Sequence, residues 1–118
     1  MKEPLKFFLI AGEPSGDLHG AKLIKAIKSL QPFSSFMGHG GYLMEKEGMK
    51  IVEHCNNLSV MGFKEVIVHL PRIWAIMNNT IALVKRVKPD RIILIDYPGF
   101  NLRFAKNISK FEIPISYF

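Results

Sequence analysis

A short polar loop follows the first apolar run and could bind an anion or a sugar. Gly12 and Gly16 permit close backbone approach, while Glu13, Ser15 and Asp17 supply polar side chains. The amides at the start of the following helix are suitable donors for such a ligand. The loop lacks both the Lys-Ser/Thr pair of a P-loop and the Gly-x-Gly-x-x-Gly dinucleotide pattern. A simple capped turn, with Asp17 acting on the helix dipole, explains these residues equally well.

A second polar loop follows the most apolar run of the chain. Asp96 comes directly after that run, Pro98 and Gly99 form a tight turn, and Asn101 can cap the next helix. We expect a carboxylate at such a strand end to be partly desolvated, a setting that suits a general base. The alternative is that Asp96 is only a turn or cap residue. Its position at the end of a buried strand favours the functional interpretation.

The histidines and the cysteine carry less information. His39 lies in a glycine-rich turn beside Gly40, where a third strand end could bring it to the same ligand. His54 and Cys55 have no second pair at zinc spacing, so we expect no metal site. Because Cys55 is the only cysteine, no intrachain disulfide can form, which fits a reducing compartment.

Alternating strands and helices are predicted to position these loops. Strands are expected at 5–11, 34–38, 50–54, 91–95 and 113–118, and helices at 18–30, 42–47 and 99–109. Between 60 and 87 an apolar helical pattern contains Pro71, which predicts two helices, the second beginning near the proline. Ser15 or Asp17 can cap the first helix. This order predicts one α/β domain over residues 1–118, a Rossmann-like parallel sheet with helices on both faces.

The stretch around 60–77 has apolar residues on more than one helical face, with Lys64 and Arg72 nearby. It is either an interfacial helix pair that contacts lipid or a helix pair buried by a partner domain, and the pattern favours neither. The apolar residues spread over more than one face are Phe63, Val68, Leu70, Ile73, Trp74 and Ile76. If the helices contact lipid, the residues expected to meet acyl chains or the membrane are Phe63, Val66, Ile67, Leu70, Ile73 and Trp74.

Composition narrows the class of protein. The chain has 118 residues, of which 48% are hydrophobic, so it can bury a core. Its net charge of +6 favours anionic partners: phosphorylated small molecules, nucleic acid or an anionic membrane leaflet. The amino terminus does not resemble a signal peptide, and we see no run long and uncharged enough to span a bilayer.

Four blocks of the sequence resemble lipid-A-disaccharide synthases, glycosyltransferase family 19. The first is Ala-Gly-Glu-Pro-Ser-Gly-Asp at 11–17, which matches the signature that opens the family. The others lie, in the same order, at 36–48, 58–66 (which includes Met61 and Gly62) and 88–101. Any one block is modest support, whereas four in register across 5–118 are specific.

The resemblance implies a GT-B glycosyltransferase, in which two Rossmann-like domains face a cleft and residues 1–118 form the N-terminal, acceptor-side domain. The implied reaction transfers 2,3-diacylglucosamine, with inversion, from UDP-2,3-diacylglucosamine to 2,3-diacylglucosamine 1-phosphate (lipid X) and releases UDP. Asp96 matches the family's candidate base. No cofactor, metal or nucleic acid is implied. The residues expected to contact substrate are Gly12, Glu13, Ser15, Gly16, Asp17, His39, Gly40, Met61, Gly62 and Asn101.

The resemblance also implies a place of action, the inner face of the cytoplasmic membrane, to which a cytoplasmic enzyme would bind peripherally. The helices at 60–77 would then receive acyl chains, and Lys64 and Arg72 would meet lipid phosphates. A homodimer is compatible with this expectation.

Two departures from the family pattern qualify it. Gly99 stands where many relatives carry a second Asp, so Asp96 would act without a second carboxylate. The sequence also stops before the family's next segment and before the domain that binds UDP, so we expect the 118 residues alone to be inactive. The alternative is a stand-alone Rossmann-like module that binds a phosphorylated lipid without catalysis.

Overall fold

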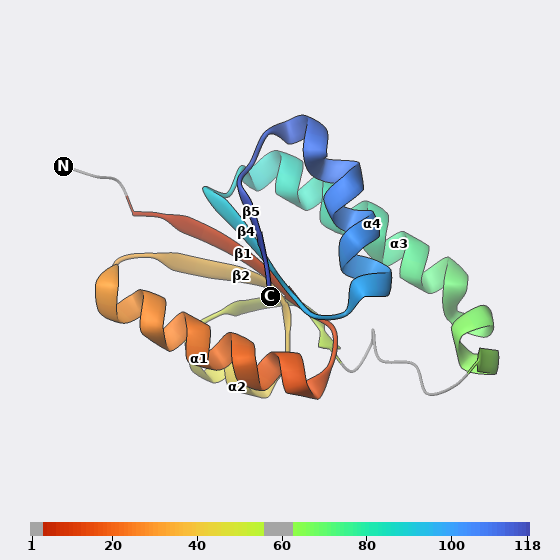
Figure 1. Ribbon diagram of the computed structural model, residues 1–118, viewed down its shortest axis with the longest axis horizontal. Coiled ribbons are helices and arrows are strands. Elements are labelled where there is room, and N and C mark those ends of the chain that lie inside the picture. Colours follow the sequence, from red (N-terminus) through yellow and green to blue (C-terminus); the bar gives the residue numbers. More distant parts are fainter. Residues whose placement is uncertain (1–3, 56–62) are drawn as a thin grey trace.

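The computed structural model describes residues 4–55 and 63–118, with side chains for 4–55 and 71–118. Figure 1 shows a twisted central sheet between two layers of helices. All four strand pairings are parallel, and the strand order is β3-β2-β1-β4-β5. The strands are β1 (Lys6–Ala11), β2 (Ser35–Gly40), β3 (Lys50–His54), β4 (Arg91–Ile95) and β5 (Ile115–Tyr117). The predicted parallel α/β fold is therefore confirmed.

Helices cover both faces of the sheet. Helices α1 (Pro14–Leu30) and α2 (Tyr42–Lys46) pack on one face, and α3 (Phe63–Val87) and α4 (Pro98–Ile108) pack on the other (Figure 1). A 3-10 turn, Ser109–Phe111, follows α4. The predicted boundaries lie within a few residues of these, except in the α3 and β2 regions.

The strand pleat assigns alternate residues to two hydrophobic cores. Along β1, Phe8 and Ile10 pack toward α3 and α4, while Leu9 and Ala11 pack toward α1 and α2; all four are fully buried. Burying a side chain as large as that of Phe8, Leu9 or Ile10 stabilises the fold by about 1.5–3 kcal/mol. Because β1 is apolar on both faces, it lies in the middle of the sheet.

Pro71 does not divide the long helix, so the prediction of two helices was wrong. The helix α3 runs without interruption for 25 residues with Pro71 inside it. Proline removes one backbone hydrogen bond, and its fixed φ is itself helical. The turns that follow gain burial of Ile76, Met77 and Val84 in the core. No helix in the described part of the chain is long and apolar enough to cross a membrane.

Strand β2 extends two residues further than predicted. His39 and Gly40 therefore lie in the strand rather than in a turn. The preceding Gly38 has φ +144° at an irregularity in the pairing with β3, and a Cβ there would collide with the carbonyl oxygen of Leu9. A glycine that looks like a turn signal in the sequence here allows close approach of two strands.

Asp17 connects α1 to α2. Its side chain is 7% exposed and accepts hydrogen bonds from the backbone amides of Gly41 (2.9 Å), Leu43 (3.1 Å) and Met44 (3.0 Å). It therefore caps α2 from another helix. The prediction that Ser15 or Asp17 caps α1 was wrong, since α1 begins at Pro14 after Glu13 without a side-chain cap.

We predict that Asp17→Ala lowers the free energy of unfolding by about 3 kcal/mol or more, because three amides lose a charged acceptor. Urea denaturation of the 118-residue chain measures this. The control is Glu45→Ala, which removes an exposed carboxylate from the first turn of α2 and should cost less than about 1 kcal/mol. Equal losses in both variants would contradict the capping role.

Candidate functional site

The two polar loops lie side by side at the carboxyl edge of the sheet. Ala11 and Ile95 are register partners on adjacent strands, so the loops that follow them start next to each other. The ring of Tyr97 packs against Gly12: a Cβ on Gly12 would lie 2.5 Å from Cδ2 of Tyr97. This close contact explains why the loop needs glycine there. Both loops thus lie at the edge of the sheet where ligands bind in open parallel sheets.

The chain turns sharply at the end of β4. Asp96 and Tyr97 both have left-handed backbone conformations, with φ of 50° and 52°. Each such residue costs about 1–2 kcal/mol when it is not glycine. Strained backbone of this kind is common at functional sites.

Asn101 stabilises this turn from within α4. Its side chain is fully buried, and Nδ2 donates to the carbonyl oxygen of Asp96 at 2.7 Å. The prediction that Asn101 caps α4 was wrong, because Tyr97 occupies the N-cap position and Asn101 lies in the first turn. Asn101 Oδ1 is buried and has no hydrogen-bond partner in the described part of the structure.

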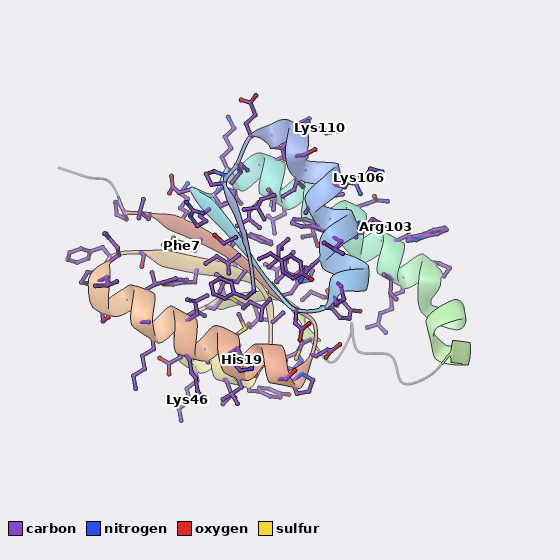
Figure 2. All side chains as sticks on the ribbon, in the orientation of Figure 1. Phe7, His19, Lys46, Arg103, Lys106 and Lys110 are labelled. Carbon is purple, nitrogen blue, oxygen red and sulfur yellow. The ribbon has the colours of Figure 1, made fainter. Side chains whose placement is uncertain are left out.

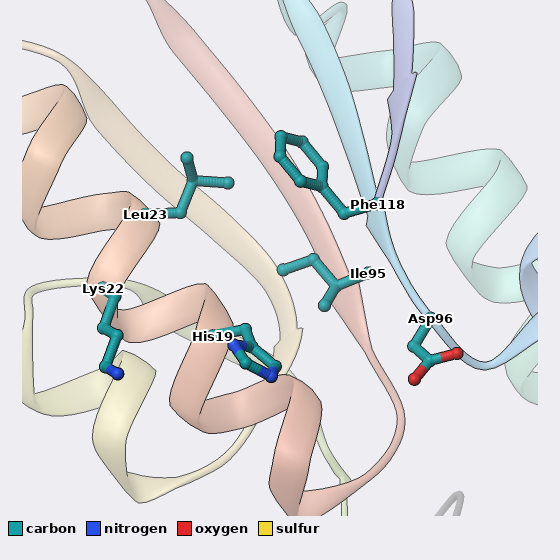
Figure 3. Close-up of a pocket in the computed structure, with 6 residues that line it drawn as sticks. All are labelled: His19, Lys22, Leu23, Ile95, Asp96 and Phe118. Atoms are coloured by element: carbon teal, nitrogen blue, oxygen red, sulfur yellow. The ribbon is translucent and has the colours of Figure 1, made fainter.

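Asp96 is exposed, so the predicted partial desolvation is not found in this domain. The strand that carries it is buried as far as Ile95, and the left-handed turn then carries the carboxylate past the sheet edge. Figure 3 shows this carboxylate at one side of a pocket whose other side is formed by α1.

That pocket has a volume of about 630 Å³. Helix α1 contributes two exposed basic side chains, His19 and Lys22, and β4 contributes an apolar floor that ends at Asp96 (Figure 3). The lining residues are His19, Lys22, Leu23, Ile95, Asp96 and Phe118. Basic groups, apolar walls and one carboxylate suit a ligand that is anionic at one end and apolar at another.

The segment 12–17, which includes the first turn of α1, has exposed and buried parts. Glu13 and Ser15 are exposed at the helix start, whereas Gly16 is buried close to the Cβ of Ala11. Desolvation, and then the negative charge of Glu13, raise the pKa of Tyr97. The polar groups of the first loop therefore interact electrostatically with the second.

Asp17 was expected to contact substrate as well. Both of its carboxylate oxygens accept hydrogen bonds from the amides at the start of α2. We therefore assign it to the scaffold that fixes this loop. Its contact with substrate stays a prediction.

His39 is a core residue. Its ring is fully buried and packs against Phe8 and Phe100, and Gly40 is buried beside it. Contact of either residue with substrate stays a prediction. The hydroxyl of Thr80 donates to the carbonyl of Ile76 at 2.6 Å, so it accepts from Nε2 of His39 at 2.9 Å. Burial lowers the pKa of His39 to about 4.

Several residues of the predicted site are not among those that the structure describes in full. Met61 and Gly62 fall outside the described residues, and the structure describes no side chains for Phe63, Val66, Ile67 and Leu70. Of the remaining predicted acyl contacts, Trp74 is 55% exposed. Ile73, which was also expected to contact acyl chains, is half-buried against the core, because it faces the sheet together with Ile76 and Met77.

Three residues near the pocket were not predicted from the sequence. His19 and Lys22 line the pocket, and Tyr117 lies beside Asp96. The hydroxyl of Tyr117 donates to the Asp96 carbonyl at 3.0 Å. The two basic residues lie three positions apart on a helix, which puts them on one face, but which face meets β4 depends on tertiary packing. The pairing of β5 with β4 brings Tyr117 to Asp96, and no local signal reveals that contact.

We predict that stability falls as the pH drops from 6.5 toward 4. Folded His39 has its pKa lowered from 6.5 to about 4, so the unfolded chain takes up a proton that the folded chain refuses. The stability contributed by neutral, buried His39 is fully present above pH 6.5. By pH 5 the free energy of unfolding has fallen by about 2 kcal/mol. Urea unfolding at pH 7 and pH 5 measures the loss. His39→Gln is the control, because glutamine does not titrate; an equal loss in this variant would contradict the assignment.

Comparison with known proteins agrees with the residue pattern. Residues 7–118 match the family model described as lipid-A-disaccharide synthetase. The lipid-A-disaccharide synthase of Myxococcus xanthus is 36% identical over 118 residues, which are 100% of this chain and 31% of that protein. The synthase of Syntrophotalea carbinolica is 39% identical over 100% of this chain and 30% of its own length.

A third relative, the synthase of Coxiella burnetii, is 40% identical over 93% of this chain and 29% of its own length. The chain therefore spans about three tenths of the length of these curated relatives. With 112 of its 118 residues inside the matched family model (7 to 118 inclusive), this chain belongs to the lipid-A-disaccharide synthetase family.

Proposed function

We propose that this chain is the acceptor-side domain of an inverting glycosyltransferase that makes lipid A disaccharide 1-phosphate. The proposed donor is UDP-2,3-diacylglucosamine, and the acceptor is 2,3-diacylglucosamine 1-phosphate. The observation that carries the proposal is the position of Asp96, a carboxylate at the carboxyl edge of a parallel sheet that lines a pocket with basic and apolar walls. Family membership supports the reaction class.

In this proposal Asp96 is the general base. It accepts the proton of the acceptor hydroxyl while that oxygen attacks the donor sugar carbon from the face opposite to UDP, which inverts the configuration. Glu13 and Ser15, exposed at the start of α1, would orient sugar hydroxyls. His19 and Lys22, across the pocket from Asp96, suit the acceptor phosphate (Figure 3).

Because position 99 is glycine, Asp96 is the one carboxylate in the segment 96–101. A Cβ at Gly99 would meet no atom within 4 Å, so packing does not require glycine there. The second Asp that the family resemblance implies would therefore fit at this position, where the chain has glycine. We propose that Asp96 acts without a carboxylate partner at this position.

The rest of the catalytic machinery would come from residues beyond these 118. The curated relatives are about three times longer than the match, and we propose that their remaining length includes the domain that binds UDP. A cleft between two domains would also cover Asp96, which is exposed in this domain.

We predict that Asp96→Asn lowers the rate of disaccharide formation by about 10³-fold, the usual size of a lost general base. The test protein is the Myxococcus xanthus synthase with its matching segment replaced by this chain, assayed with radiolabelled 2,3-diacylglucosamine 1-phosphate. The control is Asp90→Asn, the same change on an exposed carboxylate just before β4, at the opposite edge of the sheet.

Near-normal turnover by the Asp96→Asn chimera would contradict the base assignment. A folded parent chimera that makes no disaccharide would contradict the proposed reaction itself and favour a binding module.

We also propose that the outer surface of α3 and α4 contacts an anionic membrane. No Asp or Glu occurs from Val66 to Pro89 or from Tyr97 to Phe111. The exposed Trp74 adds an aromatic side chain suited to a lipid interface. Figure 2 shows Arg103 and Lys106 on α4 and Lys110 in the 3-10 turn that follows it. The exposed basic residues of this layer are Arg72, Lys85, Arg86, Lys88, Arg103, Lys106 and Lys110.

We predict that replacing Arg103 and Lys106 together by Ser weakens binding of the 118-residue chain to vesicles containing phosphatidylglycerol by about thirtyfold, since each basic residue near such a surface contributes about 1 kcal/mol. Flotation of the vesicles measures binding. The control replaces Lys25 and Lys46, exposed residues of the α1 and α2 layer, by Ser and removes the same charge from the other side. Equal weakening by both pairs would contradict a specific contact surface.

A further inference from the structure

The carbonyl oxygen of Asp96 is held by side chains from two different elements. Nδ2 of Asn101, in α4, donates to it at 2.7 Å, and the hydroxyl of Tyr117, in β5, donates to it at 3.0 Å. The amide of Asp96 also donates to the carbonyl of Phe118 at 2.8 Å. Both polar backbone groups of Asp96 are therefore fixed.

These bonds stabilise a backbone conformation that residues other than glycine, aspartate included, adopt at a cost in free energy. With φ at 50°, and with φ of Tyr97 at 52°, the backbone lies in the left-handed region that disfavours side chains other than glycine. The φ and ψ angles of a residue set the direction of its Cβ. A return of Asp96 to the extended region would therefore turn its carboxylate away from the position seen in Figure 3.

Packing does not account for tyrosine at position 117. The side chain is 44% exposed on β5, an edge strand of the sheet, so phenylalanine would contribute similar burial. What tyrosine adds is the hydroxyl, and the hydroxyl donates to Asp96. A tyrosine hydroxyl is protonated at neutral pH and can donate there. Desolvation, and then the charge of Asp96, raise the pKa of Tyr117 further.

We propose that Tyr117 is a positioning residue: its hydroxyl holds the Asp96 backbone in the left-handed conformation that directs the carboxylate into the pocket. Its value to catalysis rests on the proposed function, in which Asp96 is the base. Asn101 supplies the second donor from the buried side of the turn, and Tyr117 supplies the donor from the exposed side.

The test is Tyr117→Phe, which removes one oxygen atom. In the 118-residue chain, NMR should show a strong intraresidue HN–Hα contact at Asp96, as a left-handed residue requires. We expect Tyr117→Phe to weaken that contact and to speed exchange of the Asp96 amide hydrogen by about tenfold. The midpoint of thermal unfolding should fall by no more than about 8 °C, the loss expected for one exposed hydrogen bond.

The matched control is Tyr42→Phe, the same chemical change on a 70% exposed tyrosine whose ring packs against His54. It should leave the Asp96 signals unchanged. An Asp96 conformation and exchange rate in Tyr117→Phe equal to those of the parent would overturn the proposal. A large global loss of stability would also overturn it, since Tyr117 would then be a structural residue.

Kinetics in the chimeric synthase separate this proposal from the proposed function. We expect Tyr117→Phe to lower kcat by about tenfold and to leave KM unchanged, because a misplaced base affects the transition state and not substrate binding. A raised KM with unchanged kcat would show that the hydroxyl contacts substrate and would overturn the positioning role. If Asp96→Asn retains full activity, the base assignment fails, and the NMR result still decides whether Tyr117 positions Asp96.

Discussion

The hydrogen-bonded pairing of β1 with β4 brings together two polar loops that are more than 80 residues apart in the chain. Each strand is buried on both faces, and Ala11 lies opposite Ile95 at their carboxyl ends. A slip of one residue in this register would separate Gly12 from the ring of Tyr97 and would exchange the faces of every β4 side chain. The position of Asp96 relative to α1 therefore depends on a backbone pairing made within the hydrophobic core.

Hydrogen bonds from buried polar side chains then fix how neighbouring elements and the turn after β4 are placed relative to one another. Asp17 joins α1 to α2 through three backbone amides, His39 joins β2 to α3 through Thr80, and Asn101 joins α4 to the turn after β4. Each residue looks like a ligand contact in the sequence, because polar residues beside glycines are typical of binding loops. In the structure each connects two elements of the scaffold, and the exposed groups nearest the pocket are Asp96, His19 and Lys22.

The sequence was sufficient to predict the alternating elements, the parallel sheet and the two loops at its carboxyl edge. Apolar runs and helical periodicity are local properties, and the edge where parallel strands end follows from the fold class. Three features could not be predicted from local pattern. Pro71 continues a helix because later turns are buried, β2 runs through Gly38 because the neighbouring strand requires a glycine, and Asp17 caps a helix other than its own.

Titration with glucosamine 1-phosphate, the head group of the proposed acceptor, tests most directly whether the two loops form one site around Asp96. The 118-residue chain labelled with ¹⁵N would be followed by amide chemical shifts. We predict saturable shifts in both loops, at Glu13–Gly16 and at Asp96–Gly99, together with His19 and Lys22 on α1. Saturable shifts confined to one loop, or confined to the outer faces of α3 and α4, would contradict a shared site.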